Sequence, residues 1–226
     1  MTVSSFSEAC DGNVVRLFVI RHGQTDYNIR QIMQGHKDIE LNQTGFEQAT
    51  LLGKRLVEDS LTFDSVASSD LIRCKQTVAT ALATSNQNLP VTYYYELRER
   101  CMGVIEGMQI DQAEKFAVEQ GKKSFRDFGE TPQEFIGRFA TCFVSVAEQA
   151  AANNHKNVAI FTHGGSIRSL LSWLHYNTSS KIPNTSVTVI DYHKDTKQFE
   201  VKVVADDMHL TGGSGSMRFV GDSRVL

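Results

Sequence analysis

An arginine and a histidine stand side by side in this 226-residue chain, directly after an apolar segment. The segment covers residues 14–20, and its β-branched side chains predict a buried strand that ends at Arg21, His22 and Gly23. A guanidinium can hold two phosphate oxygens, and a neutral imidazole offers a nitrogen lone pair to phosphorus. Gly23 allows a sharp turn and a close approach of a ligand to the backbone. A single histidine after a strand is more often structural than nucleophilic, so the hypothesis of phosphoryl chemistry depends on the rest of the chain.

Polar side chains follow other predicted strands in the same way. Arg73, Glu99 and His163 each come shortly after a strand-like segment. The carboxyl ends of parallel strands lie at one edge of a sheet, where ligands bind. We therefore expect these groups to meet Arg21 and His22 at that edge, and their convergence is a stronger indication than any one of them alone.

The expected chemistry is attack by His22 on phosphorus, with a phosphohistidine as intermediate. The other ring nitrogen of His22 should donate to a backbone carbonyl, and nearby guanidinium groups should lower the pKa of the ring and keep it neutral. Arg21 and Arg73 would neutralise the phosphate and stabilise the transition state. His163 would donate to a phosphoryl oxygen, and the glycines after it, beginning with Gly164, leave the backbone at a helix start open to an anion.

Glu99 is the expected general acid, which protonates the leaving alkoxide and then activates water. Alternatively, Glu99 has only a structural role, in an ion pair with Arg98 or Arg100. Glu106 is a second candidate for the general acid. For Arg21 and Arg73 the alternative is a surface salt bridge, and for His163 it is a helix cap. No cluster of residues has metal-ligand spacing, so the sequence predicts neither a metal nor another cofactor.

These residues belong to a chain in which predicted strands and helices alternate. Strands are expected at 14–20, 63–68, 91–95, 158–162, 186–193 and 199–205, the last two as a hairpin. Helices are expected at 44–58 with a capping box of Thr44 and Glu47, after a cap at 68–70, at 110–120, at 131–153 with a second capping box, and after His163. The stretch 26–42 is expected to be a polar loop. This order predicts an α/β fold, a three-layer sandwich whose mainly parallel sheet has helices on both faces.

We expect a single domain over 1–226, with a flexible leader at 1–13, a short cap region at about 100–131 and a flexible tail at about 211–226. Within the cap, residues 108–131 are either a solvated face or a mobile flap over the site.

Composition narrows the classes of partner. The formal net charge is −3 and the pI about 6.2, which does not favour nucleic acid. The four cysteines are far apart, there is no run of about 20 apolar residues for a bilayer, and the N-terminus is unlike a signal peptide. We therefore expect a cytoplasmic, or a cytoplasmic and nuclear, protein that acts on a small phosphorylated metabolite. The sequence predicts no oligomeric state.

Four motifs occur in a fixed order along the chain, namely Arg21-His22-Gly23-Gln24-Thr25 with Asn28, Ser68-Ser69-Asp70-Leu71-Ile72-Arg73 with Gln76-Thr77, Leu97-Arg98-Glu99-Arg100 with Gly103 and Glu106-Gly107, and His163-Gly164-Gly165. Together they resemble the histidine phosphatase superfamily, also called phosphoglycerate mutase-like, over residues 14 to about 205. The resemblance implies a phosphohistidine on His22, a phosphate pocket that includes Arg21, Arg73 and His163, Glu99 as proton donor, and no metal. It also implies that Asn28, Gln34 and Gly35 line the pocket.

Within the superfamily, residues 97–107 resemble TIGAR-type fructose-2,6-bisphosphatases and fungal broad-specificity phosphatases. The stretch 99–163 is shorter than the cap insertion of TIGAR, and Arg100-Cys101-Met102-Gly103 replaces the Arg-Tyr-Tyr-Gly segment of phosphoglycerate mutases. The first hypothesis is therefore a metal-independent phosphatase for small phosphomonoesters, with sugar phosphates of carbohydrate metabolism as the expected class. The alternatives are a fructose-2,6-bisphosphatase, a phosphoglycerate mutase or narrow bisphosphatase, and a non-enzymatic phosphate-binding module. Candidates for holding a second phosphate are Arg98, Arg100, Lys37 and Lys75.

Overall fold

A six-stranded mixed sheet forms the centre of the structure, a computed structural model that describes residues 12–211 apart from 178 and 180. Most of the predicted leader and all but residue 211 of the predicted tail lie outside the described residues. The strand order is β3-β2-β4-β1-β5-β6. The strands are β1 (Val14–Arg21), β2 (Ser65–Ser69), β3 (Val91–Tyr94), β4 (Asn157–Thr162), β5 (Val187–His193) and β6 (Gln198–Asp206).

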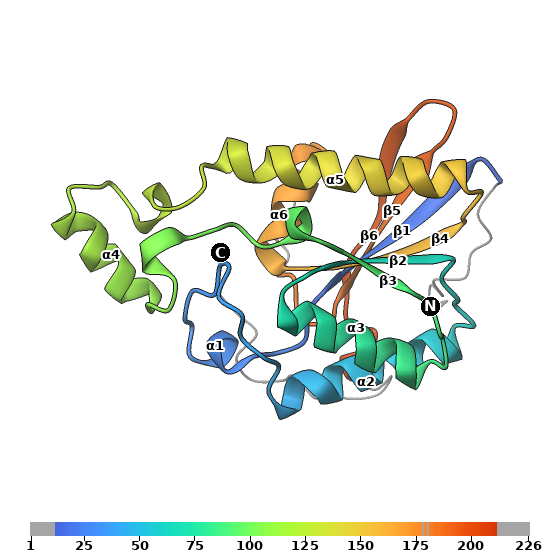
Figure 1. Cartoon of the computed structure of the whole chain (residues 1–226), viewed down its shortest axis with the longest axis horizontal. Coiled ribbons are helices and arrows are strands. Elements are labelled where there is room, and N and C mark those ends of the chain that lie inside the picture. The colour runs from blue at the N-terminus through green and yellow to red at the C-terminus, as the bar shows by residue number, and fades with distance from the viewer. Residues whose placement is uncertain (1–11, 178, 180, 212–226) are drawn as a thin grey trace.

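Helices cover both faces of the sheet, as predicted (Figure 1). One face packs against α2 (Gln43–Glu58) and α3 (Ile72–Thr84), and the other against α5 (Pro132–Ala152) and α6 (Gly164–Trp173). Side chains alternate along β1 accordingly, since Leu17 belongs to the α5 and α6 core and Phe18 to the α2 and α3 core. The predicted three-layer α/β sandwich is therefore confirmed.

The carboxyl ends of the parallel strands are aligned at one edge. β1 and β2 both pair in parallel with β4, and β3 pairs in parallel with β2. In this register Arg21 lies beside Thr162, and Ser68 lies beside Phe161. The residues that follow β1, β2 and β4 are thus delivered to one place. β5 and β6 form the predicted antiparallel hairpin, and β5 runs antiparallel to β1.

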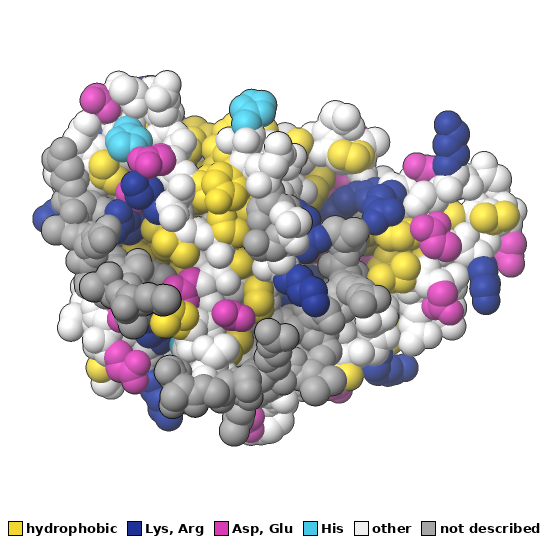
Figure 2. Space-filling model, turned by 180° about the vertical axis from the view of Figure 1, so that it is seen from behind, with side chains coloured by type: hydrophobic (Ala, Val, Ile, Leu, Met, Phe, Trp, Pro, Cys, Tyr) yellow, Lys and Arg dark blue, Asp and Glu magenta, His cyan; other side chains and the backbone are white. Residues whose placement is uncertain are grey.

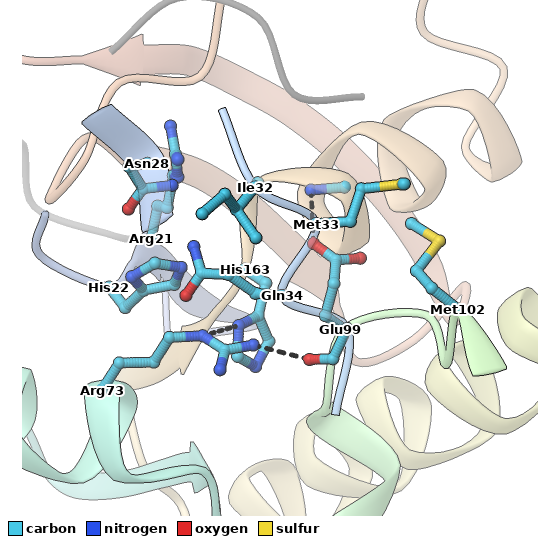
Figure 3. A pocket seen from close by; sticks show the side chains of 13 residues that line it. Arg21, His22, Asn28, Ile32, Met33, Gln34, Arg73, Glu99, Met102 and His163 are labelled. Carbon is cyan, nitrogen blue, oxygen red and sulfur yellow. Dashed lines mark hydrogen bonds between the residues drawn. The ribbon is translucent and has the colours of Figure 1, made fainter. Parts of the chain in front are cut away.

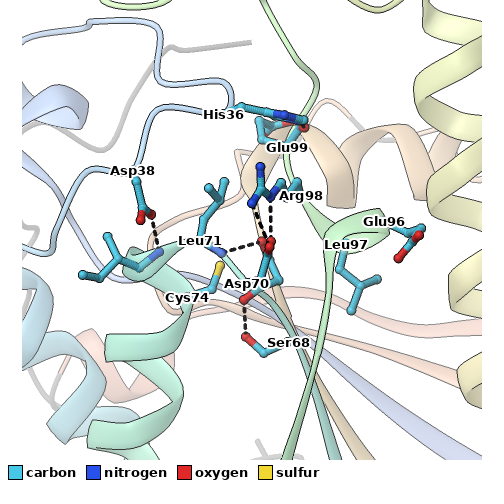
Figure 4. A network of polar contacts seen from close by, with 12 residues as sticks. His36, Asp38, Ser68, Asp70, Leu71, Cys74, Glu96, Leu97, Arg98 and Glu99 are labelled. Atoms are coloured by element: carbon cyan, nitrogen blue, oxygen red, sulfur yellow. Dashed lines mark hydrogen bonds and ion pairs between the residues drawn. The ribbon is translucent and has the colours of Figure 1, made fainter.

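Two predicted helix starts were wrong. The side chain of Asn42, not Thr44, caps α2 by accepting a hydrogen bond from the Gly45 N–H at 2.9 Å. The first turn of α3 receives no cap from residues 68–70; the Ile72 N–H instead donates to Asp38 Oδ1 at 2.6 Å, from a loop far back in the chain (Figure 4). The capping box predicted at the start of α5 is confirmed.

Two one-turn helices occur where the sequence predicts no helix. α1 (Asp26–Ile29) lies in the predicted polar loop, closed by a reciprocal capping box between Thr25 and Asn28. α7 (Met208–Thr211) follows the last strand. Helices this short carry no hydrophobic periodicity, which is the signal on which the prediction relied.

The cap region (100–131) extends beyond the carboxyl ends of the parallel strands (Figure 1). After the 3₁₀ turn η1 (Tyr95–Leu97) it contains η2 (Gly103–Ile105), α4 (Ile110–Glu119) and η3 (Phe125–Asp127), and α4 agrees closely with the predicted helix at 110–120. The cap packs around a small apolar core, to which the 32–35 loop contributes Met33 and the cap itself contributes Met102, Ile105, Ala113 and Phe125. No helix in the described part of the chain has the length and apolar character needed to span a membrane.

Candidate active site

The predicted catalytic residues lie together in a pocket at the carboxyl edge of the sheet (Figure 3). β1, β2 and β4 deliver most of the polar groups, and the 32–35 loop and the cap complete the walls. The lining residues are Arg21, His22, Asn28, Ile32, Met33, Gln34, Gly35, Arg73, Glu99, Met102, His163, Gly164 and Gly165.

The His22 ring is oriented by its own backbone turn. Nδ1 lies 2.7 Å from the Gly23 carbonyl oxygen, which can only accept, so Nδ1 carries the hydrogen and Nε2 keeps its lone pair. This is the contact that the sequence predicts. Gly23 is required here because a Cβ at this position would lie 2.6 Å from the Gly45 carbonyl oxygen. The Gly23 N–H donates to Thr77 Oγ1 at 2.9 Å, and Asn184 Nδ2 donates to the His22 carbonyl at 2.8 Å, which fix the turn on both sides.

The environment keeps the His22 imidazole neutral. Burial lowers the pKa of His22 well below its usual value, and the charges of Arg73 and then Arg21 lower it further against the opposing effect of the Gly23 carbonyl. A neutral ring with an available Nε2 is the form that can attack phosphorus.

Arg73 is a buried cation held by carbonyl oxygens. Its side chain is 1% exposed; Nη2 donates to the Gly35 carbonyl and Nη1 to the Lys37 carbonyl, both at 2.8 Å. Nε donates to Nδ1 of His163 at 3.2 Å. One N–H remains on each terminal nitrogen, and no carboxylate pairs with Arg73 within the described residues. A buried charge without a counter-ion is unfavourable, so this position favours an anion.

His163 lies at the N-terminal cap position of α6, but its side chain does not make the capping hydrogen bond expected of a purely structural histidine. Nε2 lies 2.9 Å from Ser69 Oγ, and Nδ1 accepts from Arg73, so both ring nitrogens have protein partners. The ring meets that of His22 edge-on, with centroids 5.3 Å apart. Burial lowers the pKa of His163 well below its usual value, and Arg73 and His22 add to this effect. Donation from His163 to a phosphoryl oxygen remains a prediction. It requires the contact between Nδ1 and Arg73 to break, so that Nδ1 can carry a proton and donate it.

The Glu99 carboxylate lies against the N-terminus of α6, because Oε2 accepts from the Gly165 N–H at 2.8 Å and Oε1 from the Arg100 N–H at 2.9 Å. A Cβ at Gly165 would lie 2.6 Å from Oε1, so only glycine allows this approach. Glu99 forms no ion pair with Arg98 or Arg100, in contrast to the purely structural role considered above. Its carboxylate therefore reaches the pocket.

The other residues predicted to line the pocket do so, with one exception described below. Oδ1 of Asn28 accepts from the Thr25 N–H at 3.0 Å, which leaves the amide hydrogens of Asn28 as donors. Oε1 of Gln34 is buried with no hydrogen-bond partner in the described part of the chain, and in Figure 3 this amide lies close to His22. Gly35 has a φ of +49° and supplies the carbonyl that Arg73 contacts. At Gly164 a Cβ would lie 3.1 Å from Nε of Arg21.

Arg98 was predicted to bind substrate, and the structure contradicts this placement. Nε and Nη2 of Arg98 donate to the two carboxylate oxygens of Asp70 at 2.6 and 2.7 Å, outside the pocket (Figure 4). The planar guanidinium fits this carboxylate bidentately and lies over the Tyr95 ring, so it is committed to the β2 edge. Lys75, another candidate for a second phosphate, lies over the Tyr93 ring instead.

Two further candidates have structural roles in the cap. Arg100 donates to the carbonyl oxygens of Arg126, Phe128 and Glu130 and thereby holds the end of the cap. Oε1 of Glu106, the rival acid, accepts from the N–H groups of His36 and Met102 at 2.9 Å and does not line the pocket.

Several residues that build the site were not predicted. Ile32, Met33 and Met102 line the pocket and make an apolar wall beside the polar phosphate end. Others contact the predicted catalytic residues or the backbone beside them, namely Ser69, Thr77, Asn184, His36 and Arg138. Ser69, Thr77 and Asn184 are buried, whereas His36 and Arg138 are partly exposed. Their roles depend on contacts between distant segments, which cannot be read from one sequence. In Figure 2, basic side chains gather where the cap meets the rest of the molecule. No group of His, Cys, Asp and Glu suited to a metal ion occurs among the described residues.

Comparisons with known proteins cover nearly the whole described chain. A family model described as the histidine phosphatase superfamily (branch 1) matches residues 17–205. A broad-specificity phosphatase of Saccharomyces cerevisiae is 50% identical over 208 residues, which cover 90% of each chain. Phosphoglycerate mutase-like protein 4 of Arabidopsis thaliana is 32% identical over 212 residues, covering 88% of this chain and 89% of its own. Among solved structures, a phosphoglycerate mutase from Bacillus anthracis matches with a TM-score of 0.80 and 29% identity, over 89% of this chain and 97% of its own.

Proposed function

This chain is a phosphatase that belongs to the histidine phosphatase superfamily (branch 1), and we propose that it hydrolyses small phosphomonoesters through a phosphohistidine at His22. The observation that carries this mechanism is the neutral His22 ring, whose Nδ1–H is bound to the Gly23 carbonyl and whose Nε2 is left available beside the buried Arg73 cation.

In the first step Nε2 of His22 forms a bond to phosphorus while the bond from phosphorus to the ester oxygen breaks. Arg21 and Arg73 stabilise the charge on the phosphoryl oxygens, with the Asn28 amide as a further donor. Glu99, in its protonated form, transfers its proton to the departing alkoxide, so the products are a neutral alcohol and a phosphorylated His22.

In the second step Glu99, now a carboxylate, removes a proton from water. The water oxygen forms a bond to phosphorus, and the bond to Nε2 of His22 breaks. Inorganic phosphate leaves, His22 is again neutral, and Glu99 again holds its proton. Each group therefore returns to its starting state without a metal or an oxidant.

The proposed substrates are small phosphomonoesters, sugar phosphates among them, accepted with broad specificity. The wall away from the phosphate end is apolar, and neither Arg98 nor Arg100 lines it. Such a wall offers few directional contacts that would select one alcohol over another. The yeast relative described as a broad-specificity phosphatase supports the same assignment. A role in carbohydrate metabolism in the cytoplasm belongs to this proposal.

The test is release of phosphate from a panel of sugar phosphates in the presence of a chelator, together with acid-quench trapping of the phosphoenzyme. We expect activity to persist with chelator, and His22→Ala to lose the trapped phosphate and at least about 10⁴-fold in kcat. His193→Ala, at the far end of β5, is the matched control and should retain both. Loss of activity with chelator, or retained activity in His22→Ala, would refute the mechanism. Incubation with 3-phosphoglycerate and a bisphosphoglycerate primer separates hydrolysis from mutase activity.

A further inference from the structure

The last helix that the structure describes, α7, is connected to the end of β1 through a turn formed by residues 182–186. This turn precedes β5 and contacts the two residues that β1 delivers to the pocket. The Thr185 N–H donates to the Arg21 carbonyl at 3.0 Å, and Asn184 Nδ2 donates to the His22 carbonyl at 2.8 Å. The backbone from which the side chains of Arg21 and His22 project is therefore held by this turn.

Thr185 adopts a backbone conformation that its own side chain disfavours. Its φ is +57°, and a β-branched side chain makes this left-handed region unfavourable. Such a conformation persists only where the surrounding contacts fix it. The residue is completely buried, and its hydroxyl donates to the Asn184 carbonyl at 2.8 Å. Because a hydroxyl has a single hydrogen, any further partner of Thr185 Oγ1 must donate to it.

His209 on α7 is that further partner. Its Nε2 lies 3.0 Å from Thr185 Oγ1, so Nε2 carries the ring hydrogen and donates it to the hydroxyl oxygen. Nδ1 is buried without a hydrogen-bond partner in the part of the chain that the structure describes. The contact of Nε2 is therefore the polar interaction that accounts for the placement of this ring. α7 itself is anchored because it packs against α2 and buries Leu210.

We infer that His209 is a positioning residue for the nucleophile, which acts through Thr185 and the 182–186 turn on the backbone of Arg21 and His22. Neither His209 nor Thr185 lines the pocket, so neither is placed to touch the substrate. Loss of the Nε2–H contact would free the Thr185 hydroxyl to rotate and would loosen the strained turn. A displacement of the reacting groups by about 1 Å can slow such a reaction on the order of 10²-fold. The inference rests on the proposed reaction at His22.

A competing role for His209 is to hold α7 on the molecule without any effect on the nucleophile. That role changes how much of the protein is folded, whereas a positioning role changes the rate constant of the chemical step in the folded protein. Single-turnover kinetics separate the two roles, because the rate constant at saturating enzyme does not depend on the folded fraction.

The experiment mixes an excess of enzyme with p-nitrophenyl phosphate and follows the release of p-nitrophenol, which reports the phosphorylation step alone. The enzyme concentration is raised until the rate constant levels off. In His209→Phe, which keeps a ring but has no N–H, we expect the levelled rate constant to fall on the order of 10–100-fold. His209→Gln should keep most of the wild-type value, because its amide can place an N–H near the position of Nε2.

His155→Phe is the matched control. It removes an imidazole contact with the Ser65 hydroxyl, also of 3.0 Å, at the amino end of β2 and thus at the opposite end of the sheet from the pocket. We expect it to leave the levelled rate constant unchanged.

Thr185→Val tests the other side of the contact, because it removes the hydroxyl and keeps the β-branched shape. We expect a fall at least as large as that of His209→Phe. The double variant should fall no further than Thr185→Val alone, since both substitutions remove the same contact.

The outcomes distinguish the inference from the proposed function. If the wild-type protein releases no p-nitrophenol, the proposed function fails. If the wild-type protein is active and His209→Phe keeps its rate constant, if His209→Gln falls as far as His209→Phe, or if the two falls add in the double variant, the inference alone is overturned. Where His209→Phe does not fold, an unchanged rate constant in Thr185→Val overturns the inference in its place.

Discussion

At the scale of single residues, the proposed reaction asks Glu99 for two successive proton transfers, and two backbone N–H groups hold its carboxylate at the edge of the pocket. The first transfer matters only when the leaving group is a strong base such as an alkoxide. The second, from water, is needed for every substrate because the same phosphohistidine is always hydrolysed. The two tasks can therefore be separated by the choice of substrate.

We predict that Glu99→Gln lowers the steady-state rate on sugar phosphates by about 10²–10⁴-fold, because the amide can neither donate nor accept the proton. With p-nitrophenyl phosphate, whose leaving group needs no proton, we expect a rapid burst of one equivalent of p-nitrophenol and then slow turnover. Rapid-mixing spectroscopy measures the burst. Glu96→Gln, an exposed neighbour, should show no burst and no loss of rate. Equal losses on both kinds of substrate without a burst would count against the assignment.

Much of the site could be predicted at this scale, since Arg21, His22, Arg73, Glu99 and His163 all line the pocket. Each lies at or shortly after the end of a strand, and the end of a strand is a local feature of the sequence. Arg98 was misplaced because its partner, Asp70, lies far back in the chain, and nothing in the local sequence reveals that pairing. The apolar wall of the pocket was not predicted for a different reason, because methionines in a loop show no hydrophobic periodicity.

At the scale of secondary-structure elements, Arg138 on α5 holds the segment that carries Glu99. Its Nη1 donates to the carbonyls of Glu96 and Arg98, at 2.7 and 3.1 Å, and Nη2 to that of Glu99 at 2.8 Å. Nε and Nη2 also reach the two oxygens of Glu130, at 2.6 and 2.7 Å. All five N–H groups of the guanidinium are thereby used. The backbone segment that carries Glu99 is thus held in place by a side chain of α5.

We predict that Arg138→Gln lowers kcat by about 10–100-fold with a smaller change in KM, because a small displacement of Glu99 impairs proton transfer more than phosphate binding. Arg138→Lys should rescue little, since an ammonium cannot reproduce the planar fork. Steady-state kinetics on a sugar phosphate, at a temperature where thermal unfolding shows each variant folded, provide the measurement. Arg126→Gln, whose side chain lies over Phe125 in the cap, is the control. If Arg138→Gln affects KM alone, Arg138 does not position Glu99.

The order and type of the long elements could be predicted because their hydrophobic periods are local. The starts of α2 and α3 could not, because each start was assigned to the nearest capping residue in the sequence. The cap of α2 lies only two residues earlier than predicted, whereas the N–H group at the start of α3 is bound by Asp38 from another loop. Strand order was also beyond local reasoning, since pairing of β1 with β4 depends on contacts across the whole chain.

At the scale of the whole molecule, three histidines from different elements couple stability to pH. Burial lowers the pKa of His22 and His163 well below the usual value, and burial together with the charge of Arg55 lowers the pKa of His209 to about 3. In the unfolded chain each returns to about 6.5. Below pH 6.5 the unfolded chain therefore binds more protons than the folded one, and stability falls as pH falls.

We predict that the free energy of unfolding decreases between pH 6.5 and 4.5, by about 1.4 kcal/mol per pH unit for each histidine that stays neutral in the folded state. His209→Gln should flatten the slope by one such increment, whatever its effect on absolute stability. Urea unfolding at a series of pH values measures the slope. An unchanged slope in His209→Gln, or stability that rises as pH falls through this range, would contradict the assignment.

The cap packs around a small apolar core distinct from the two cores of the sheet, so two parts of the chain build the pocket. In the proposed reaction the residues at the strand ends act on phosphorus, whereas Met102, which belongs to the small apolar core of the cap, lines the side of the pocket proposed for the alcohol. Replacing residues 100–131 as a unit can therefore change the selectivity for the alcohol, while the proposed nucleophile and its arginines stay unchanged. A chimera carrying the cap of a relative should inherit that relative's preference among esters together with this chain's phosphoenzyme.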